Sequence, residues 1–77
     1  MRDTVRRVVS SVLGVPEDDI NESTGPDTIE AWDSLQHMNL ILALEEELGV
    51  QFSDDDIVSM LDVGTIYEKA EALVAAK

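Results

Sequence analysis

The segment from residue 34 to about residue 48 constrains the fold of this 77-residue chain more than any other part of the sequence. Apolar residues recur in it with the period of an α-helix, and Gly49 then offers a left-handed C-terminal cap. At about 100° per residue, one set of apolar residues gathers on a single side of this predicted helix: Leu40, Ile41, Leu44 and Leu48. Other helices have to cover such a face, so the segment predicts a helical bundle.

A second apolar stripe lies nearly opposite the first on the same predicted helix. Leu35, Met38 and Leu42 follow the spacing i, i+3 and i+7. It is bordered by polar and acidic residues: Asn39, Glu45 and Glu46. We expect this stripe to stay partly exposed, because so short a chain provides only three further helices. The alternative is that those helices wrap far enough round to bury both stripes. An exposed apolar strip with an acidic border favours a surface that docks transient partners.

The N-terminal segment predicts a second helix, with one apolar stripe: Val5, Val8, Val9, Val12 and Leu13. Asp3 or Thr4 can cap its start, and Gly14 and Pro16 end it.

The sequence then predicts a long loop over residues 14–32, with one short turn near residues 16–20. Loops longer than about 12 residues are usually functional or disordered. We therefore expect three apolar residues to pin this one to the core: Ile20, Ile29 and Trp32.

Two shorter helices complete the predicted fold. Ser53 is a suitable N-cap for a helix with acidic residues 54–56 in its first turn and an end near Leu61. Gly64 and the capping box of residues 65–68 predict the last helix. Its inward stripe is Ile66, Ala70, Leu73 and Val74. The fold class is therefore all-α, a four-helix bundle with a long first loop and a short third helix, and we expect residues 1–77 to form a single domain.

Composition limits the classes of partner. The chain has 17 acidic and 5 basic residues and a formal net charge of -12, which repels nucleic-acid phosphates and favours partners with basic patches. The alternative is that this charge serves only solubility. With no cysteine, neither a disulfide nor a thiolate metal site can form, and we expect a cytoplasmic protein. No run approaches the roughly 18 apolar residues of a membrane span.

Asp33 and Ser34 both suit the N-cap of the central helix. If Asp33 is the cap, Gln36 can reach back to it as in a capping box, and the Ser34 hydroxyl is left free at the positive end of the helix dipole. The alternative makes Ser34 itself the cap. His37 falls among the core-side residues of this helix, where we expect a packed or hydrogen-bonded side chain.

Three stretches together resemble a known family. They are Asp33-Ser34-Leu35 at a helix start, the run MNLILALEEELG over residues 38–49, and Phe52-Ser53-Asp54 at the entry to a short helix. In this helix order, length and acidity, the sequence resembles the acyl carrier proteins and phosphopantetheine-binding carrier domains, over essentially the whole chain. The resemblance implies a four-helix bundle of the acyl-carrier-protein type.

By this resemblance Ser34 is the attachment point of 4′-phosphopantetheine, delivered from coenzyme A by a phosphopantetheinyl transferase. The protein is then a carrier and not an enzyme, and it holds acyl or aminoacyl groups as thioesters. Its further partners would be an acyl- or aminoacyl-loading ligase or transferase and the downstream synthase enzymes of fatty-acid, polyketide, peptide or related biosynthesis. We expect it to act as a monomer.

The resemblance also assigns two sets of residues. The surface that partner enzymes recognise comprises Asp33, Leu35, Met38, Asn39, Leu42, Glu45 and Glu46. A cavity for a bound acyl chain, between the second and third helices, would involve Phe52, Ile57 and Met60. The alternative for this second set is an ordinary place in the core.

The sequence departs from typical fatty-acid carriers, which often have acidic residues just after the Asp-Ser-Leu motif. Gln36, His37 and Asn39 stand there instead, and Trp32 precedes the motif. A Trp-Asp-Ser-Leu opening looks more like specialised stand-alone carriers of polyketide, peptide or other secondary pathways, including some that carry amino acids.

Three other readings compete with the carrier. A catalytic triad is precluded because Asp33, Ser34 and His37 lie within one turn of one helix. Acidic residues 54–56 lack the ligand spacing of a calcium loop, so we predict no metal site. The remaining competitor is an acidic helical adaptor that binds a basic partner through the central helix and is never modified at Ser34.

Overall fold

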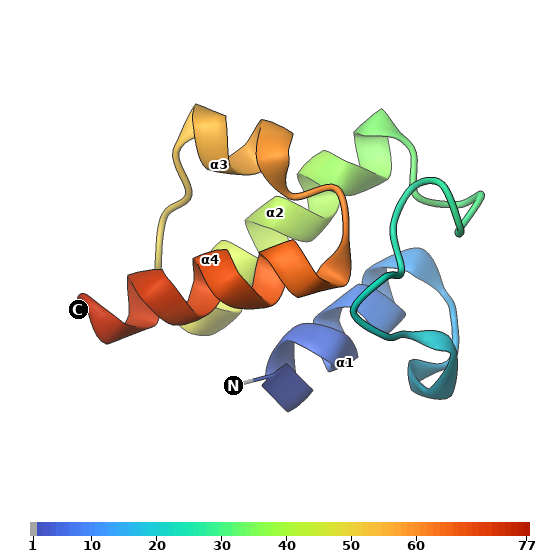
Figure 1. The fold of residues 1–77 in the computed structure, drawn as a ribbon, viewed down its shortest axis with the longest axis horizontal. Coiled ribbons are helices and arrows are strands. Elements are labelled where there is room, and N and C mark those ends of the chain that lie inside the picture. The colour runs from blue at the N-terminus through green and yellow to red at the C-terminus, as the bar shows by residue number, and fades with distance from the viewer. Residues whose placement is uncertain (1) are drawn as a thin grey trace.

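Five helical segments follow one another in the computed structural model, which describes residues 2–77 (Figure 1). They are α1 (Arg2–Leu13), the 3₁₀ turn η1 (Glu17–Asp19), α2 (Ser34–Leu48), α3 (Asp54–Ser59) and α4 (Val63–Ala75). Within the described residues there is no strand, and none of these helices is long and apolar enough to cross a membrane. The predicted all-α bundle with a long first loop and a short third helix is confirmed.

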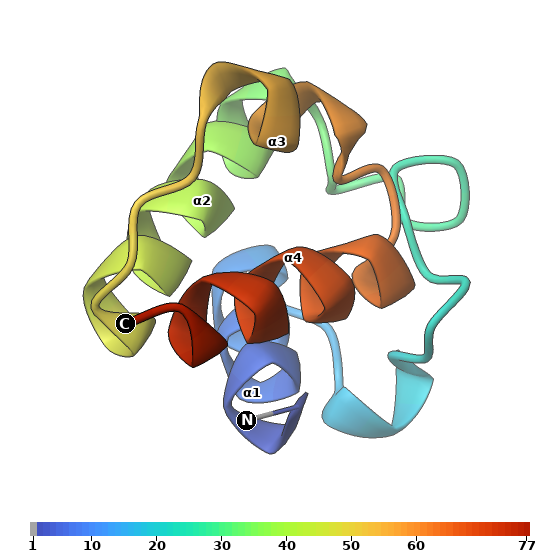
Figure 2. The same ribbon diagram turned by 60° about the vertical axis from the view of Figure 1, so that its left-hand side comes forward.

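The two ribbon views show how α1, α2 and α4 are arranged (Figures 1 and 2), and most of the buried core residues come from these three helices. α1 packs against both α2 and α4, and short α3 runs beside the N-terminal half of α2. The largest fully buried side chains are Leu40, Ile41, Leu44, Met60, Ile66, Val5, Val9 and Val63. Aliphatic residues therefore supply most of the apolar burial that stabilises the bundle.

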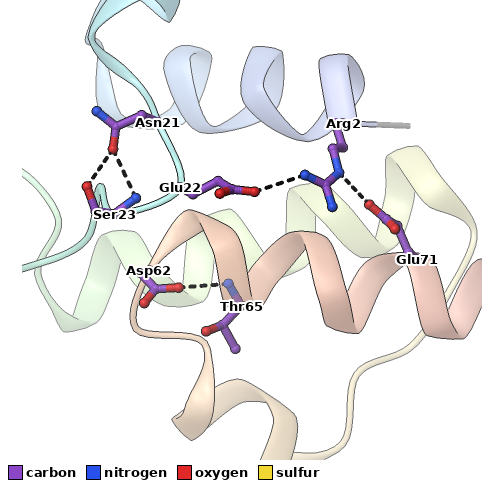
Figure 3. A network of polar contacts seen from close by, with 7 residues as sticks. All are labelled: Arg2, Asn21, Glu22, Ser23, Asp62, Thr65 and Glu71. Carbon is purple, nitrogen blue, oxygen red and sulfur yellow. Dashed lines mark hydrogen bonds and ion pairs between the residues drawn. The ribbon is translucent and has the colours of Figure 1, made fainter.

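The apolar stripe of α1 is buried as expected, except that Val12 is only partly buried. The predicted start of this helix is wrong, because Asp3 and Thr4 already lie inside its first turn; its N-cap position falls outside the described residues. Arg2 in this first turn contacts two other segments of the chain. Figure 3 shows its guanidinium between Glu22 and Glu71, at 2.9 and 2.7 Å. The guanidinium also lies 4.9 Å over the Tyr67 ring, and the hydrogen bond that it donates to the Glu71 carboxylate raises the pKa of Arg2.

The long loop is pinned as predicted: Ile20 and Trp32 are buried and Ile29 packs partly buried against the core. Backbone bonds add to this anchoring. The Thr24 carbonyl accepts from Val63 N at 2.8 Å, and the Glu22 carbonyl accepts from Gly64 N at 2.9 Å. The loop thereby satisfies two of the free N–H groups that every helix start exposes.

These bonds lie at the start of α4, whose N-cap is Asp62, a residue that was not predicted to cap this helix. The predicted capping box at residues 65–68 is wrong, because Asp62 is the N-cap and accepts from Thr65 N at 2.7 Å (Figure 3). Thr65 therefore lies one turn inside the helix. Of the predicted inward stripe, Ile66 and Ala70 are buried and Leu73 packs partly buried against the core, whereas Val74 is only partly buried. Val63 and Tyr67 are buried in addition.

α3 begins as predicted and ends earlier than predicted. Ser53 and Asp56 form a reciprocal capping box: Ser53 Oγ accepts from Asp56 N at 3.1 Å, and Asp56 Oδ2 accepts from Ser53 N at 3.2 Å. The helix stops at Ser59, because Leu61 N donates to the Ser59 carbonyl and not to Ile57. This turn leaves the Ile57 carbonyl free for another partner.

Candidate functional site

The start of α2 settles which residue caps the helix. Asp33 is the N-cap, and its Oδ1 accepts from Gln36 N at 2.9 Å. Ser34 is the first helical residue; it is exposed, and its hydroxyl has no hydrogen-bond partner within residues 2–77. The predicted return bond from Gln36 is absent from this part of the chain: Gln36 Oε1 instead accepts from Asn39 Nδ2 at 3.2 Å, and Asp33 N donates to the Ala31 carbonyl. Ser34 is thus held in place by the helix while its hydroxyl stays free.

A groove of about 580 Å³ opens beside Ser34, between the start of α2 and α3. It is lined by Pro26, Trp32, Asp33, Ser34, His37, Met38, Ile57, Val58 and Leu61. Most of these side chains are apolar, and Asp33 and Ser34 lie at its polar edge. The volume is in the range of pockets that bind small molecules.

His37 joins the loop, α2 and α3 along this groove. Its Nδ1 accepts from Trp32 Nε1 at 3.0 Å, and its Nε2 lies 2.8 Å from the Ile57 carbonyl. An indole N–H can only donate, so Nδ1 must be the acceptor and Nε2–H must be the donor to Ile57. The two rings also stack, with centroids 6.1 Å apart. The expectation that His37 is a packed, hydrogen-bonded side chain is confirmed, but its partner 20 residues away could not be seen from the spacing.

The expectation that the second stripe of α2 stays exposed is confirmed. Leu35, Met38 and Leu42 are 70%, 45% and 59% exposed, whereas Leu40, Ile41 and Leu44 on the other face are buried. Sequence reasoning missed two further apolar residues on the same side of the molecule, Val58 at 69% and Leu61 at 61% exposed. Both lie on or just after α3, whose six residues are too few to show a helical period.

The polar residues beside this stripe differ in their contacts. Asn39 and Glu46 are exposed. Glu45 is only half-exposed, and its Oε2 accepts from Phe52 N at 2.8 Å. The carboxylate of Glu45 therefore holds the α2–α3 connection in place, a structural task in addition to the recognition role predicted for it.

The three residues predicted for an acyl cavity do not come together in one lining. Ile57 lines the groove beside Ser34, whereas Phe52 and Met60 are buried in the hydrophobic core. Within residues 2–77 no cluster of three or more acidic or histidine side chains is placed to hold a metal ion. The site therefore offers one free hydroxyl at the N-terminus of a long helix, an apolar groove next to it and an apolar, acid-bordered helix face.

Comparison with known proteins agrees with this geometry. The family model described as "Phosphopantetheine attachment site" matches residues 3–73. Acyl carrier proteins of Clostridium perfringens, strains SM101 and ATCC 13124, are 41% identical over 69 residues, covering 88% of this chain and 90% of theirs. The solution structure of holo acyl carrier protein from Geobacter metallireducens superposes with a TM-score of 0.88 at 27% identity, covering 97% of this chain and 86% of that one. The chain therefore belongs to the acyl carrier protein family, whose members are carriers with covalently attached 4′-phosphopantetheine and not enzymes.

Proposed function

We propose that Ser34 is the residue that accepts the 4′-phosphopantetheine arm, and that the protein carries acyl or aminoacyl groups as thioesters on it. One observation carries this proposal: Asp33 performs the capping, so the exposed Ser34 hydroxyl has no structural task. In the transfer, the Ser34 oxygen forms a bond to the pantetheine-side phosphorus of coenzyme A. The diphosphate bond breaks, adenosine 3′,5′-bisphosphate leaves, and the hydroxyl proton passes to a base of the transferase.

The position of Ser34 favours the phosphodiester that results. The N–H groups of Ser34 and Leu35 are in the first turn of α2, where they have no acceptor among the described residues. A phosphodiester there gains from these donors and from the positive end of the helix dipole. The negative charge of the Asp33 carboxylate, which accepts from Gln36 N, opposes the phosphodiester in part.

We propose that the exposed stripe of α2 is the surface that partner enzymes recognise. Leu35, Met38 and Leu42 supply apolar contact, and the exposed Asp33, Asn39 and Glu46 beside them favour a basic partner. These partners would be the phosphopantetheinyl transferase, the ligase or transferase that loads the arm, and the downstream synthase enzymes. The net charge of -12 opposes self-association through this face, which supports action as a monomer.

The residues around Ser34 support a specialised pathway over housekeeping fatty-acid synthesis. At the positions where typical fatty-acid carriers often have acidic residues, Asn39 donates a side-chain hydrogen bond to Gln36. In the same part of the molecule, the Trp32 indole donates to His37. These replacements change the charge that a partner meets just after the attachment site. The carried group would then be an acyl or aminoacyl group of a secondary pathway.

The test is intact-protein mass spectrometry after incubation with coenzyme A, magnesium and a promiscuous phosphopantetheinyl transferase. We expect a mass gain of one phosphopantetheine arm, which Ser34→Ala abolishes. Ser11→Ala, which removes an exposed serine on α1, is the matched control and should keep the gain. No gain on the folded wild-type protein, beside a carrier that is modified in parallel, would refute the proposal and favour the unmodified adaptor.

A further inference from the structure

The groove beside Ser34 ends at a hydrogen-bonded bridge made by Trp32, His37 and the Ile57 carbonyl. Both ring nitrogens of His37 are used, at 3.0 Å to Trp32 Nε1 and 2.8 Å to Ile57 O. The carbonyl of Ile57 is available because α3 stops two residues later and Leu61 N turns back to Ser59. Trp32 is only 2% exposed, so the loop end of the bridge is firmly buried.

This bridge joins α2 to α3 where the groove borders the core. Of the three predicted cavity residues, Ile57 lines the groove and also packs partly buried against the core, whereas Phe52 and Met60 lie within the core. A chain that leaves the groove toward them has to pass between α2 and α3, which the His37–Ile57 bond joins. A chain that enters there would break one of these bonds and leave the indole N–H of Trp32 or the imidazole N–H of His37 without an acceptor, which is energetically unfavourable for a buried group.

We propose that His37 determines which carried groups the protein can shelter, because its bridge keeps the cargo in the shallow groove and out of the core. This proposal rests on the proposed attachment of the arm to Ser34, which lies at the edge of this groove. Met38, Val58 and Leu61 give the groove apolar walls, against which a short acyl or aminoacyl group can pack when the arm folds back along the protein. A longer linear chain keeps its far end in solvent or on a partner. His37 is a positioning residue here and takes no part in chemistry.

The experiment compares two cargoes on the full chain. A promiscuous transferase loads the arm from acetyl-coenzyme A or octanoyl-coenzyme A, and intact mass confirms that each thioester is on Ser34. The rate at which hydroxylamine cleaves each thioester is then measured, together with the amide shifts of Phe52 and Met60 in ¹⁵N-correlated NMR spectra. The ratio of the octanoyl rate to the acetyl rate reports shelter of the longer chain, because instability of a variant affects both cargoes.

For the wild type we expect a ratio at or above that of the two free pantetheine thioesters, because only the short group is sheltered, and no octanoyl-dependent shift at Phe52 or Met60. In His37→Ala the octanoyl thioester should be cleaved roughly three to ten times more slowly relative to acetyl, the range that corresponds to one buried hydrogen bond. The shifts of Phe52 and Met60 should then move. His37→Gln can still donate to Ile57 and should restore the wild-type ratio, and Gln36→Ala, which has no bond to α3, should not change it.

Two results would overturn the proposal: a wild-type protein that already protects octanoyl and shifts Phe52 and Met60, or a folded His37→Ala variant with an unchanged ratio. If His37→Ala does not fold by circular dichroism, Trp32→Phe removes the indole donor while keeping a ring, and the same comparison applies to it. Failure of loading at Ser34 is seen separately in the mass spectrum and would refute the proposed function instead.

Discussion

Leu44→Ala and Leu42→Ala are expected to separate the structural face of α2 from its exposed face. Leu44 is fully buried and Leu42 is 59% exposed, yet the two residues are two positions apart on one helix. Truncation of a buried leucine costs about 2–5 kcal/mol. A 77-residue domain has a total stability of about 4–12 kcal/mol at the usual per-residue value, so Leu44→Ala removes a large part of it.

The assay is thermal unfolding followed by circular dichroism on the two variants side by side. A loss of about 2 kcal/mol lowers the Tm of a domain this size by roughly 8–16 °C, and this is the minimum expected for Leu44→Ala. Leu42→Ala should stay within about 0.5 kcal/mol of the wild type. It should instead slow modification by the transferase, because it removes an apolar contact from the exposed stripe. Equal loss of Tm in both variants would contradict the two-face description of α2.

Three further predictions concern the polar contacts. Asp33→Ala should lower stability by about 1 kcal/mol through loss of the cap, whereas Asp33→Asn, which keeps an acceptor, should lose little in urea unfolding. Glu45→Ala should increase hydrogen exchange at the Phe52 amide, which loses its acceptor, and Glu46→Ala should leave that amide unchanged. The hydrogen bond from the Ser53 backbone N–H lowers the pKa of Asp56 below its ordinary value of 3.8. The ionised Asp56 carboxylate therefore stabilises the fold above pH 3.8, and this stabilisation is lost as the pH falls through the lowered pKa of the folded state. In Asp56→Asn the Tm should therefore depend less steeply on pH below about pH 4 than in the wild type, and an equally steep dependence would contradict this.

The long helices could be predicted from the sequence because their periods are complete. Over the fifteen residues of α2, the spacing separated the buried Leu40 and Leu44 from the exposed Leu35 and Leu42. Gly49 was also recognisable as the C-cap, and its φ of 65° is the left-handed conformation that glycine adopts readily. Local signals of this kind need no knowledge of the tertiary fold.

The parts that sequence reasoning missed depend on contacts between distant segments. Asp62 caps α4 in a place where the first-turn N–H groups meet carbonyls of Glu22 and Thr24, some forty residues earlier in the chain. The bond of Glu45 to Phe52 N and that of His37 to Ile57 O likewise require the α2–α3 connection to fold back. No periodicity in the sequence encodes such contacts, so the groove beside Ser34 could not be predicted from it.

The construction of α3 has a consequence for how the molecule can move. Its six residues bury none of their side chains fully, and polar contacts hold the segment: the bond of Glu45 to Phe52 N, the bond of His37 to the Ile57 carbonyl, the two bonds of the Ser53–Asp56 capping box and the Lys69–Asp56 ion pair. A segment with so little buried apolar surface opens at a smaller free energy than the whole domain. α3 is thus the natural unit of local unfolding, so the surface next to Ser34 can be reshaped by a partner while α1, α2 and α4 keep the core closed.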